Sequence, residues 1–182
     1  RHFSSNNVGL VFMRQVVQEE GGYNHFFVTK CITDHRCMRS NRGYANIAPL
    51  YFFDFGSVSP EDPLVGVNIS EKFMDIVREC LLADLSPFDV FSYIYGVFYS
   101  PHYRILHSDR LKRDFPRVPL PKTSSLFHSI SSFGEILISL HLMESPELES
   151  VISTYVGPPA PEVARVAWLN DTVWLDAPVA RN

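Results

Sequence analysis

The strongest constraint on the fold comes from residues 86–121, which read SPFDVFSYIYGVFYSPHYRILHSDRLKRDFPRVPLP. Two Ser-Pro pairs, Ser86-Pro87 and Ser100-Pro101, each place a capping hydroxyl before a proline suited to the first turn of a helix. Apolar and aromatic side chains occupy nearly every side of the first of these helices: Phe88, Val90, Phe91, Tyr93, Ile94, Tyr95, Val97, Phe98 and Tyr99. A helix that is apolar all round is buried, so we expect this one at the centre of the fold.

The second Ser-Pro pair begins a helix that is basic. Its cations are Arg104, Arg110, Lys112 and Arg113, and the prolines that end it are Pro116, Pro119 and Pro121. The segment thus presents positive charge beside a rigid core, which is typical of a surface that contacts a phosphate backbone.

The charge of the whole chain is less informative than its distribution. The 182 residues are 46% apolar, enough for one domain with a real core, and the formal net charge is −4. Ten of the 16 Lys and Arg residues nevertheless lie in two windows, residues 30–42 and 102–122. The rest of the chain is strongly acidic, which excludes a protein that binds polyanions over its whole surface.

The three cysteines have no disulfide-framework spacing, which indicates a reducing compartment. The sequence contains no signal peptide and no run of about 18 apolar residues, so no membrane partner is expected. The chain begins without methionine and closes on VWLDAPVARN, which suggests a strand leading into something absent. We therefore expect a cytoplasmic fragment of a larger protein, truncated at its C-terminal end.

The order of predicted elements indicates an α+β fold. Strands are expected in a β-rich region, 7–56, at residues 7–17, 25–33 and 47–55. A central block of about four helices follows over residues 68–143. The first is capped by Asn68 or Ser70 and runs to about Ala83, and its core face is expected to consist of Phe73, Ile76, Val77, Cys80 and Leu81. The two Ser-Pro helices come next, and the last helix runs from about Ser124 to Met143. A second β-rich region, 148–176, contains strands predicted at 148–156, 163–169 and 172–176. No βαβ alternation appears, so a mixed or antiparallel sheet packed on helices is expected within a single domain, 1–182.

No motif points to catalysis within this chain. Cys31, His35 and Cys37 are close together, but a structural zinc site needs four ligands, so a buried Cys31 beside an ordinary loop is the favoured interpretation. Phosphate loops, dinucleotide fingerprints and hydrolase motifs are missing from the sequence. We predict no catalytic residue and no metal site.

Two groups of side chains suit nucleic acid. The loop 34–46 contains Arg36, Arg39, Asn41 and Arg42, and Arg and Asn can read guanine and adenine edges, although an ordinary solvated loop is an equal alternative. Arg104, Lys112, Arg113 and Arg117 suit phosphate contacts, which position a protein without reading sequence. The alternative for Lys112 and Arg113 is a helix C-terminus that favours cations because of its dipole.

Several of these segments resemble one family. Residues 88–104, FDVFSYIYGVFYSPHYR, are similar to the signature FDYIYAVLHSPxYR, and residues 111–121, LKRDFPRVPLP, to LKxDFPRIPLP. Residues 8–15 resemble its GLVxSRQ strand, and further matches occur at 27–29, 49–51 and 140–144, so the resemblance spans roughly residues 8–176. The family is the C-terminal target-recognition region of single-polypeptide Type I (Type ISP) restriction enzymes and related fused methyltransferase-nucleases. Its closing helix, GGYQVLEKWLK, is absent from this chain.

This resemblance implies a function for the parent protein. The parent would combine an adenine-N6 methyltransferase, a nuclease and an ATP-driven motor, using S-adenosylmethionine, ATP and Mg²⁺, while the present fragment needs no cofactor. The fragment would recognise a sequence in double-stranded DNA and pair with the methyltransferase domain of the same polypeptide. Residue chemistry adds Arg14 and Gln15 to the predicted base contacts. The alternative is a protein-interaction module that docks a methyltransferase to other subunits.

Overall fold

The computed structural model describes residues 3, 7–14, 23–38, 43–53, 64–81 and 84–176. The chain divides into two compact units, residues 1–148 and 149–182. Helices and antiparallel strand pairs make up both the core and the periphery, which confirms the predicted α+β class. The single domain over 1–182 stays a prediction. Within the described helices, none has the length and apolarity needed to cross a bilayer.

The first unit is built on an antiparallel sheet of three strands in the order β2-β1-β3. The strands are β1 (Gly9–Met13), β2 (Phe26–Thr29) and β3 (Ala45–Pro49), and Leu10 pairs with Val28 on one side and with Ala48 on the other. β1 is almost wholly buried because it is the central strand. Strand β2 falls within the predicted strand 25–33. The single strand predicted at 47–55 is instead divided at Leu50 between β3 and a strand of another sheet, Tyr51–Phe53.

A second strand pair follows, formed by β4 (Tyr51–Phe53) and β5 (Leu64–Val67). The buried Asn7 side chain joins β4 to the start of β1: its Nδ2 donates to the Tyr51 carbonyl at 2.8 Å, and its Oδ1 accepts from the Tyr51 amide at 3.2 Å. None of the strands predicted from the sequence covers β5. The sequence LVGV is too short to predict a strand by itself, and its extended conformation depends on pairing with β4.

Helix α1 (Glu71–Leu81) begins after Ser70, whose carbonyl accepts from the amides of Phe73 and Met74. Its buried face consists of Met74, Val77 and Leu81. The prediction that Cys80 faces the core is wrong. The residue is exposed, because the buried stripe of α1 runs through Met74, Val77 and Leu81 and Cys80 lies beside it.

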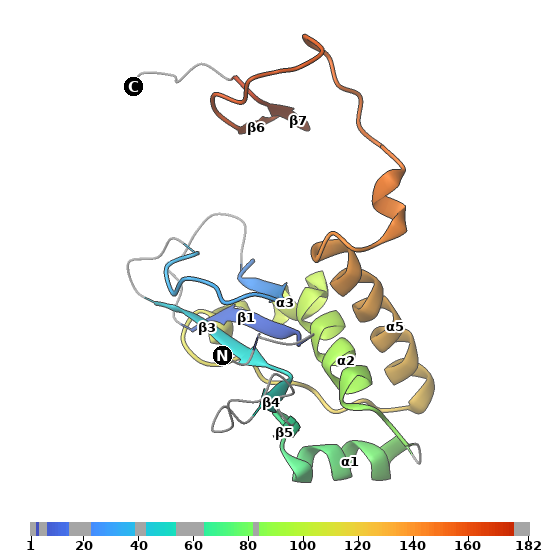
Figure 1. Cartoon of the computed structure of the whole chain (residues 1–182). Helices are drawn as coiled ribbons and strands as arrows, with labels where there is room; N and C mark the ends of the chain where they lie inside the picture. The colour runs from blue at the N-terminus through green and yellow to red at the C-terminus, as the bar shows by residue number, and fades with distance from the viewer. Residues whose placement is uncertain are drawn as a thin grey trace. The chain divides into compact units, whose positions relative to one another are not determined.

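Helix α2 (Pro87–Tyr99) is the centre of the first unit, as predicted (Figure 1). Ser86 and Asp89 form a reciprocal capping box at its start, and seven of its residues are buried. One side packs on the sheet, where the rings of Phe98 and Phe26 stack at 4.5 Å. The other side packs on α5 (Ser124–His141), where Tyr93 stacks on Phe127 at 5.1 Å. The sheet, α2 and α5 therefore form successive layers.

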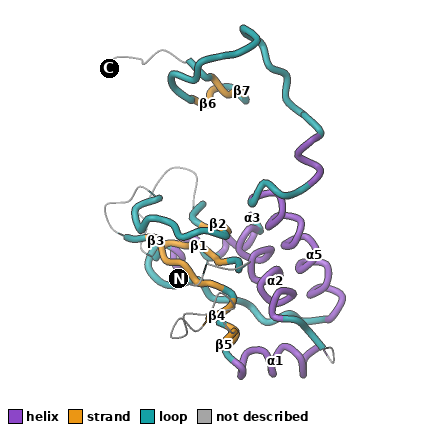
Figure 2. The backbone as a smooth tube through the Cα atoms, in the orientation of Figure 1, coloured by secondary structure: helices purple, strands orange, loops and turns teal. Residues whose placement is uncertain are grey.

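The basic segment is divided into two short helices, not one. Ser100 caps α3 (Pro101–Leu106) through its hydroxyl, as predicted, but the chain breaks at His107 before α4 (Ser108–Leu111). Residues 114–121 then run without regular secondary structure, and we call this segment the strap. It leads through the proline-rich exit to Thr123, which caps α5. Figure 2 shows this alternation of helices and loop.

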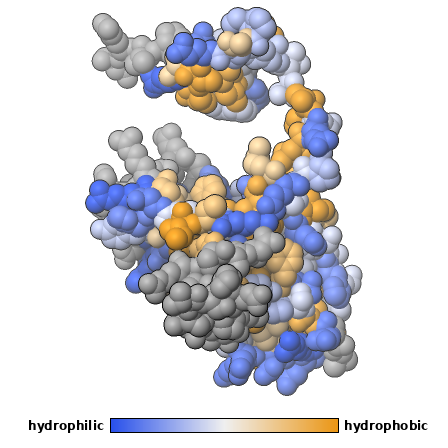
Figure 3. Space-filling view, in the orientation of Figure 1, coloured by the Kyte–Doolittle hydropathy of each residue, from blue (hydrophilic) through white to orange (hydrophobic). Residues whose placement is uncertain are grey.

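The second unit contains a small antiparallel hairpin, β6 (Ala167–Leu169) and β7 (Thr172–Trp174). Asn170 and Asp171 turn the chain with φ of 52° and 55°, as expected of a two-residue hairpin loop. The hairpin falls within the predicted strands 163–169 and 172–176, and its apolar side chains are exposed (Figure 3).

The strand predicted at 148–156 is wrong. A 3-10 helix, η1 (Pro146–Glu149), ends there, and the residues that follow are exposed and irregular, with Ile152 fully exposed. The β-branched residues favoured a strand, but that preference has an effect only when a neighbouring strand offers a surface on which to pack.

Candidate nucleic-acid interface

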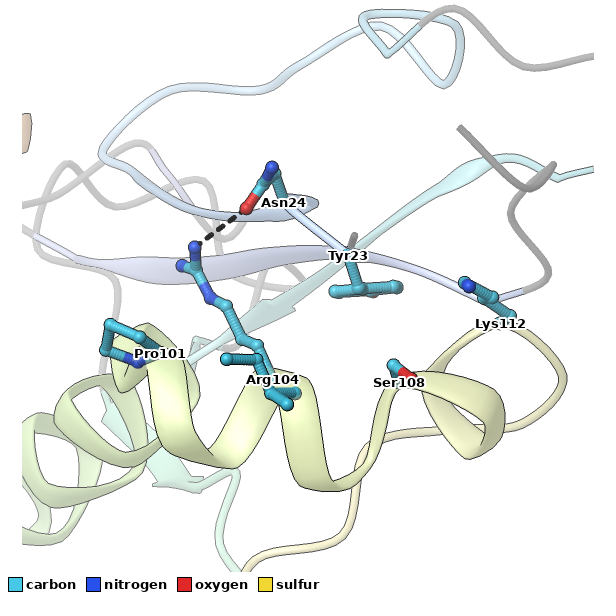
Figure 4. Close-up of a pocket in the computed structure, with 7 residues that line it drawn as sticks. Tyr23, Asn24, Pro101, Arg104, Ser108 and Lys112 are labelled. Carbon is cyan, nitrogen blue, oxygen red and sulfur yellow. Dashed lines mark hydrogen bonds between the residues drawn. The ribbon is translucent and has the colours of Figure 1, made fainter. Parts of the chain in front are cut away.

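A cleft of about 510 Å³ lies between the segment that enters β2 and the two basic helices. Its wall on the strand side is formed by Tyr23 and Asn24, and its other wall comes from α3, α4 and the residue after them (Figure 4). The remaining lining residues are Pro101, Arg104, Ile105, Ser108 and Lys112. These seven residues include two cations and no acid, so the cleft favours an anion.

Arg104, a predicted phosphate contact, also fastens the fold. Its Nε donates to the Phe98 carbonyl at 2.8 Å, and its Nη1 donates to Asn24 Oδ1 at 3.1 Å across the cleft (Figure 4). Its guanidinium carbon lies 4.2 Å from the centre of the Tyr99 ring. These bonds use two of its five N–H donors, so Arg104 joins the end of α2 to the entrance of β2.

Tyr23 makes the strand-side wall of this cleft rigid. The side chain is buried, and its hydroxyl donates to the Met13 carbonyl at 2.5 Å. Burial raises the pKa of Tyr23 well above its ordinary value, so the hydroxyl remains a donor. Lys112 is half-buried at the rim, and no hydrogen bond or ion pair of the described residues occupies its ammonium group. The strand side of the cleft is thus fixed to β1, while Lys112 supplies a positive charge on the opposite side.

A second group of predicted contacts gathers around the strap. The guanidinium carbon of Arg14, at the end of β1, lies 5.0 Å from the centre of the Phe115 ring. Arg117 lies two residues after Phe115 in the strap. It is exposed, and its Nη2 lies 3.9 Å from Asp114 Oδ2. An exposed pair at that distance contributes little to stability. The strap therefore brings a predicted base contact, Arg14, close to a predicted phosphate contact.

Two buried tyrosines hold the strap in place. Tyr103 Oη donates to the Arg117 carbonyl at 2.8 Å, and Tyr93 Oη donates to the Pro119 carbonyl at 2.9 Å. Burial raises the pKa of both hydroxyls, which keeps them protonated as donors. The side chains of Val118 and Pro121 turn inward, whereas Phe115 and Arg117 are exposed.

The loop between β2 and β3 contains four further predicted base contacts, Arg36, Arg39, Asn41 and Arg42, and hydrophilic side chains gather over it (Figure 3). Arg36 is exposed, and its amide donates to Asp34 Oδ1 at 2.6 Å. Arg39, Asn41, Arg42 and also Gln15 lie outside the described residues. Arg113 is exposed near the end of α4. The assignment of all ten side chains to bases or phosphates stays a prediction.

The burial predicted for Cys31 is wrong. Cys31 is exposed and not buried, and Cys37 is exposed as well. The Thr29 hydroxyl binds the backbone at Cys31, because it accepts a hydrogen bond from the Cys31 amide at 3.0 Å. Within the described ranges, no three His, Cys, Asp or Glu side chains are grouped as metal ligands.

Sequence analysis missed three residues of this surface: Asn24, Ser108 and Phe115. Asn24 lies just before the predicted strand 25–33, and its contact with Arg104 joins positions far apart in the chain. The aromatic character of Phe115 between basic residues was the available signal for the third. Pairing of Phe115 with Arg14 requires the fold.

Comparison with known families settles which family this is. The sequence model of the Type ISP C-terminal specificity domain matches residues 1–179. The chain belongs to this family. None of the curated proteins matches it.

A solved structure shares the fold of this Type ISP specificity domain. It is the cryoEM structure of a DrdV–DNA complex, with a TM-score of 0.60 and 20% sequence identity. The match covers 87% of the present chain and 14% of the other chain. The shared fold thus extends over most of the present chain.

Proposed function

We propose that this specificity domain recognises a particular sequence in double-stranded DNA and directs adenine-N6 methylation and cleavage by other domains of its parent protein. The observation that carries the proposal is the gathering of predicted contacts at two adjoining places, the cleft and the strap, on a Type ISP specificity domain. The parent's S-adenosylmethionine, ATP and Mg²⁺ would be bound elsewhere in the polypeptide, in a methyltransferase domain and a motor. A cytoplasmic location belongs to the same proposal.

The two places suit different parts of the duplex. Arg104 and Lys112 give the cleft two positive charges without an acid, which suits phosphate oxygens. Arg14 and Arg36 are exposed at a strand end and in a loop, where side chains can enter a groove. Phosphate contacts would set the register, and the exposed arginines would read base edges.

The proposal is tested by selecting bound sequences from a random duplex DNA pool at low salt, followed by sequencing. Low salt matters because phosphate contacts weaken steeply as salt concentration rises. Enrichment of one short motif supports sequence recognition. Binding without enrichment reduces the function to a basic clamp and contradicts the proposal.

Lys112→Ala provides the matching test of a phosphate contact. We expect weaker binding to every sequence and a decrease of about 1 in the salt slope of log K, because one cation no longer displaces counterions. The control is Lys72→Ala, since Lys72 is an exposed lysine on α1, where no predicted contact lies. Equal salt slopes for the two variants would remove Lys112 from the interface.

One observation favours a second function, docking of another protein. The outer face of α5 exposes Leu126, Phe133 and Ile136, which share a side of the helix. That face contains apolar side chains and serines, so it does not suit a phosphate backbone. Absence of salt-dependent DNA binding by the full chain would favour this protein-interaction function over DNA recognition.

A further inference from the structure

Phe115 has two neighbours that together fix its ring. Phe12 and Phe115 form a T-shaped contact, with ring centres 6.0 Å apart and planes at 70°. Phe12 is itself packed against the hydrophobic core. On another side the ring meets the Arg14 guanidinium at 5.0 Å. Phe115 is nevertheless 45% exposed, so part of its ring contacts the edge of the core and part contacts solvent.

The backbone on both sides of this ring is restrained. The Phe115 amide donates to Asp114 Oδ1 at 2.8 Å, and the Arg117 carbonyl accepts from the buried Tyr103 hydroxyl at 2.8 Å. Pro116 removes a further rotational freedom between them. The ring is therefore held by the backbone of the strap, and not only by its side-chain contacts.

An arginine that rests on a fixed ring has lost much of its freedom before it binds anything. A free arginine side chain has large rotamer entropy, and a planar guanidinium stacks on aromatic faces. Stacking on a ring leaves the in-plane N–H groups available for hydrogen bonds, in the fork that matches guanine O6 and N7. The ion pairs of the described residues include none with Arg14, so its charge is not neutralised as that of Arg117 is by Asp114.

We propose that Phe115 is a positioning residue that holds the Arg14 guanidinium for reading a guanine edge in the major groove. This rests on the proposed function, because it assigns one base pair of the recognised site to Arg14. Phe115 acts through Arg14. Its contribution is to specificity at that base pair, and the affinity of the domain for DNA in general is independent of it.

The test uses the full chain and the motif enriched from the random pool. Each base pair of the motif is replaced in turn, and the ratio of dissociation constants for replaced and unreplaced duplex is measured. Arg14→Ala is expected to lower this ratio about 5- to 150-fold at one G·C pair, the discrimination of a bidentate contact. At the same pair Phe115→Leu is expected to lower it about two- to fivefold, the contribution of an exposed cation–π contact. Phe115→Tyr, which keeps the ring face, is expected to retain it.

The matched control is Phe133→Leu, the same substitution at an exposed phenylalanine on α5. It should leave discrimination unchanged at every base pair. Phe115→Leu added to Arg14→Ala should have no further effect at the assigned pair, because the positioned group is already gone. Binding of unrelated duplex and the thermal unfolding midpoint should be nearly equal for Phe115→Leu and the control.

Each contrary result has one meaning. If the wild-type chain enriches a motif but Arg14→Ala changes discrimination at no pair, the positioning role is overturned and sequence recognition stands. An equal loss on all sequences in Phe115→Leu, with reduced stability, makes the ring merely structural and also overturns it. If the wild-type chain enriches no motif, the proposed function fails and this inference fails with it.

Discussion

Two glycines determine how closely α2 and α5 approach each other. A Cβ on Gly96 would lie 2.6 Å from the Ile130 carbonyl oxygen, and one on Gly134 would clash with the Ser92 carbonyl. Both obstacles are backbone atoms, which cannot rotate away. The absence of a side chain at these positions therefore permits the Tyr93–Phe127 stack.

Gly134→Ala should lower the free energy of unfolding by about 1–3 kcal/mol, because the two helices must separate to admit the methyl group. Denaturant unfolding measures this. Gly66→Ala is the matched control, since a Cβ there meets nothing within 4 Å; it should stay within about 0.5 kcal/mol of the wild type. Equal effects of the two substitutions would contradict the close approach of the helices.

Among the elements, the strap depends on hydrogen bonds from buried tyrosines. Tyr93→Phe removes the donor to the Pro119 carbonyl, at a cost of about 1 kcal/mol. If the strap opens locally, trypsin should cleave after Arg117 about fivefold faster, in proportion to the open population. The control is Tyr99→Phe, which removes a hydroxyl from the same helix without a bond to the strap. Equal cleavage rates would show that the hydroxyl bond does not hold the segment.

The same elements show what a single sequence can predict. Helix α2 was predictable because its caps and its apolar surface are local: Ser86, Pro87 and Asp89 lie within one turn. The division of the basic segment at His107 was not predictable, because the sequence has no glycine or proline at that point. Strand β5 and the contact of Arg14 with Phe115 depend on partners distant in the chain. Residue chemistry could therefore name candidate contacts but could not group them into a cleft and a strap.

At the scale of the whole molecule, His141 links folding to pH. Its Nδ1 lies 2.7 Å from Tyr95 Oη, and its ring centre lies 4.6 Å from that of Tyr99. Burial, and secondly the charge of Arg104, lower the pKa of His141 below its ordinary value. Burial raises the pKa of Tyr95, so its hydroxyl donates to Nδ1 and the imidazole is neutral in the folded state.

The sign of the pH dependence follows from this lowered pKa. As pH falls below about 6.5, the ordinary histidine value, the unfolded chain binds a proton at His141 before the folded chain does. The free energy of unfolding should therefore be unaffected by His141 above that pH and should decrease as pH falls from about 6.5 through the folded-state pKa. His141→Gln, whose side-chain oxygen can accept from Tyr95 without titrating, should reduce this slope in denaturant unfolding followed from about pH 7 to about pH 5. The control is His128→Gln, which alters an exposed histidine of the same helix and should keep the wild-type slope. If His141→Gln has the same slope as this control, His141 is not the source of the pH dependence.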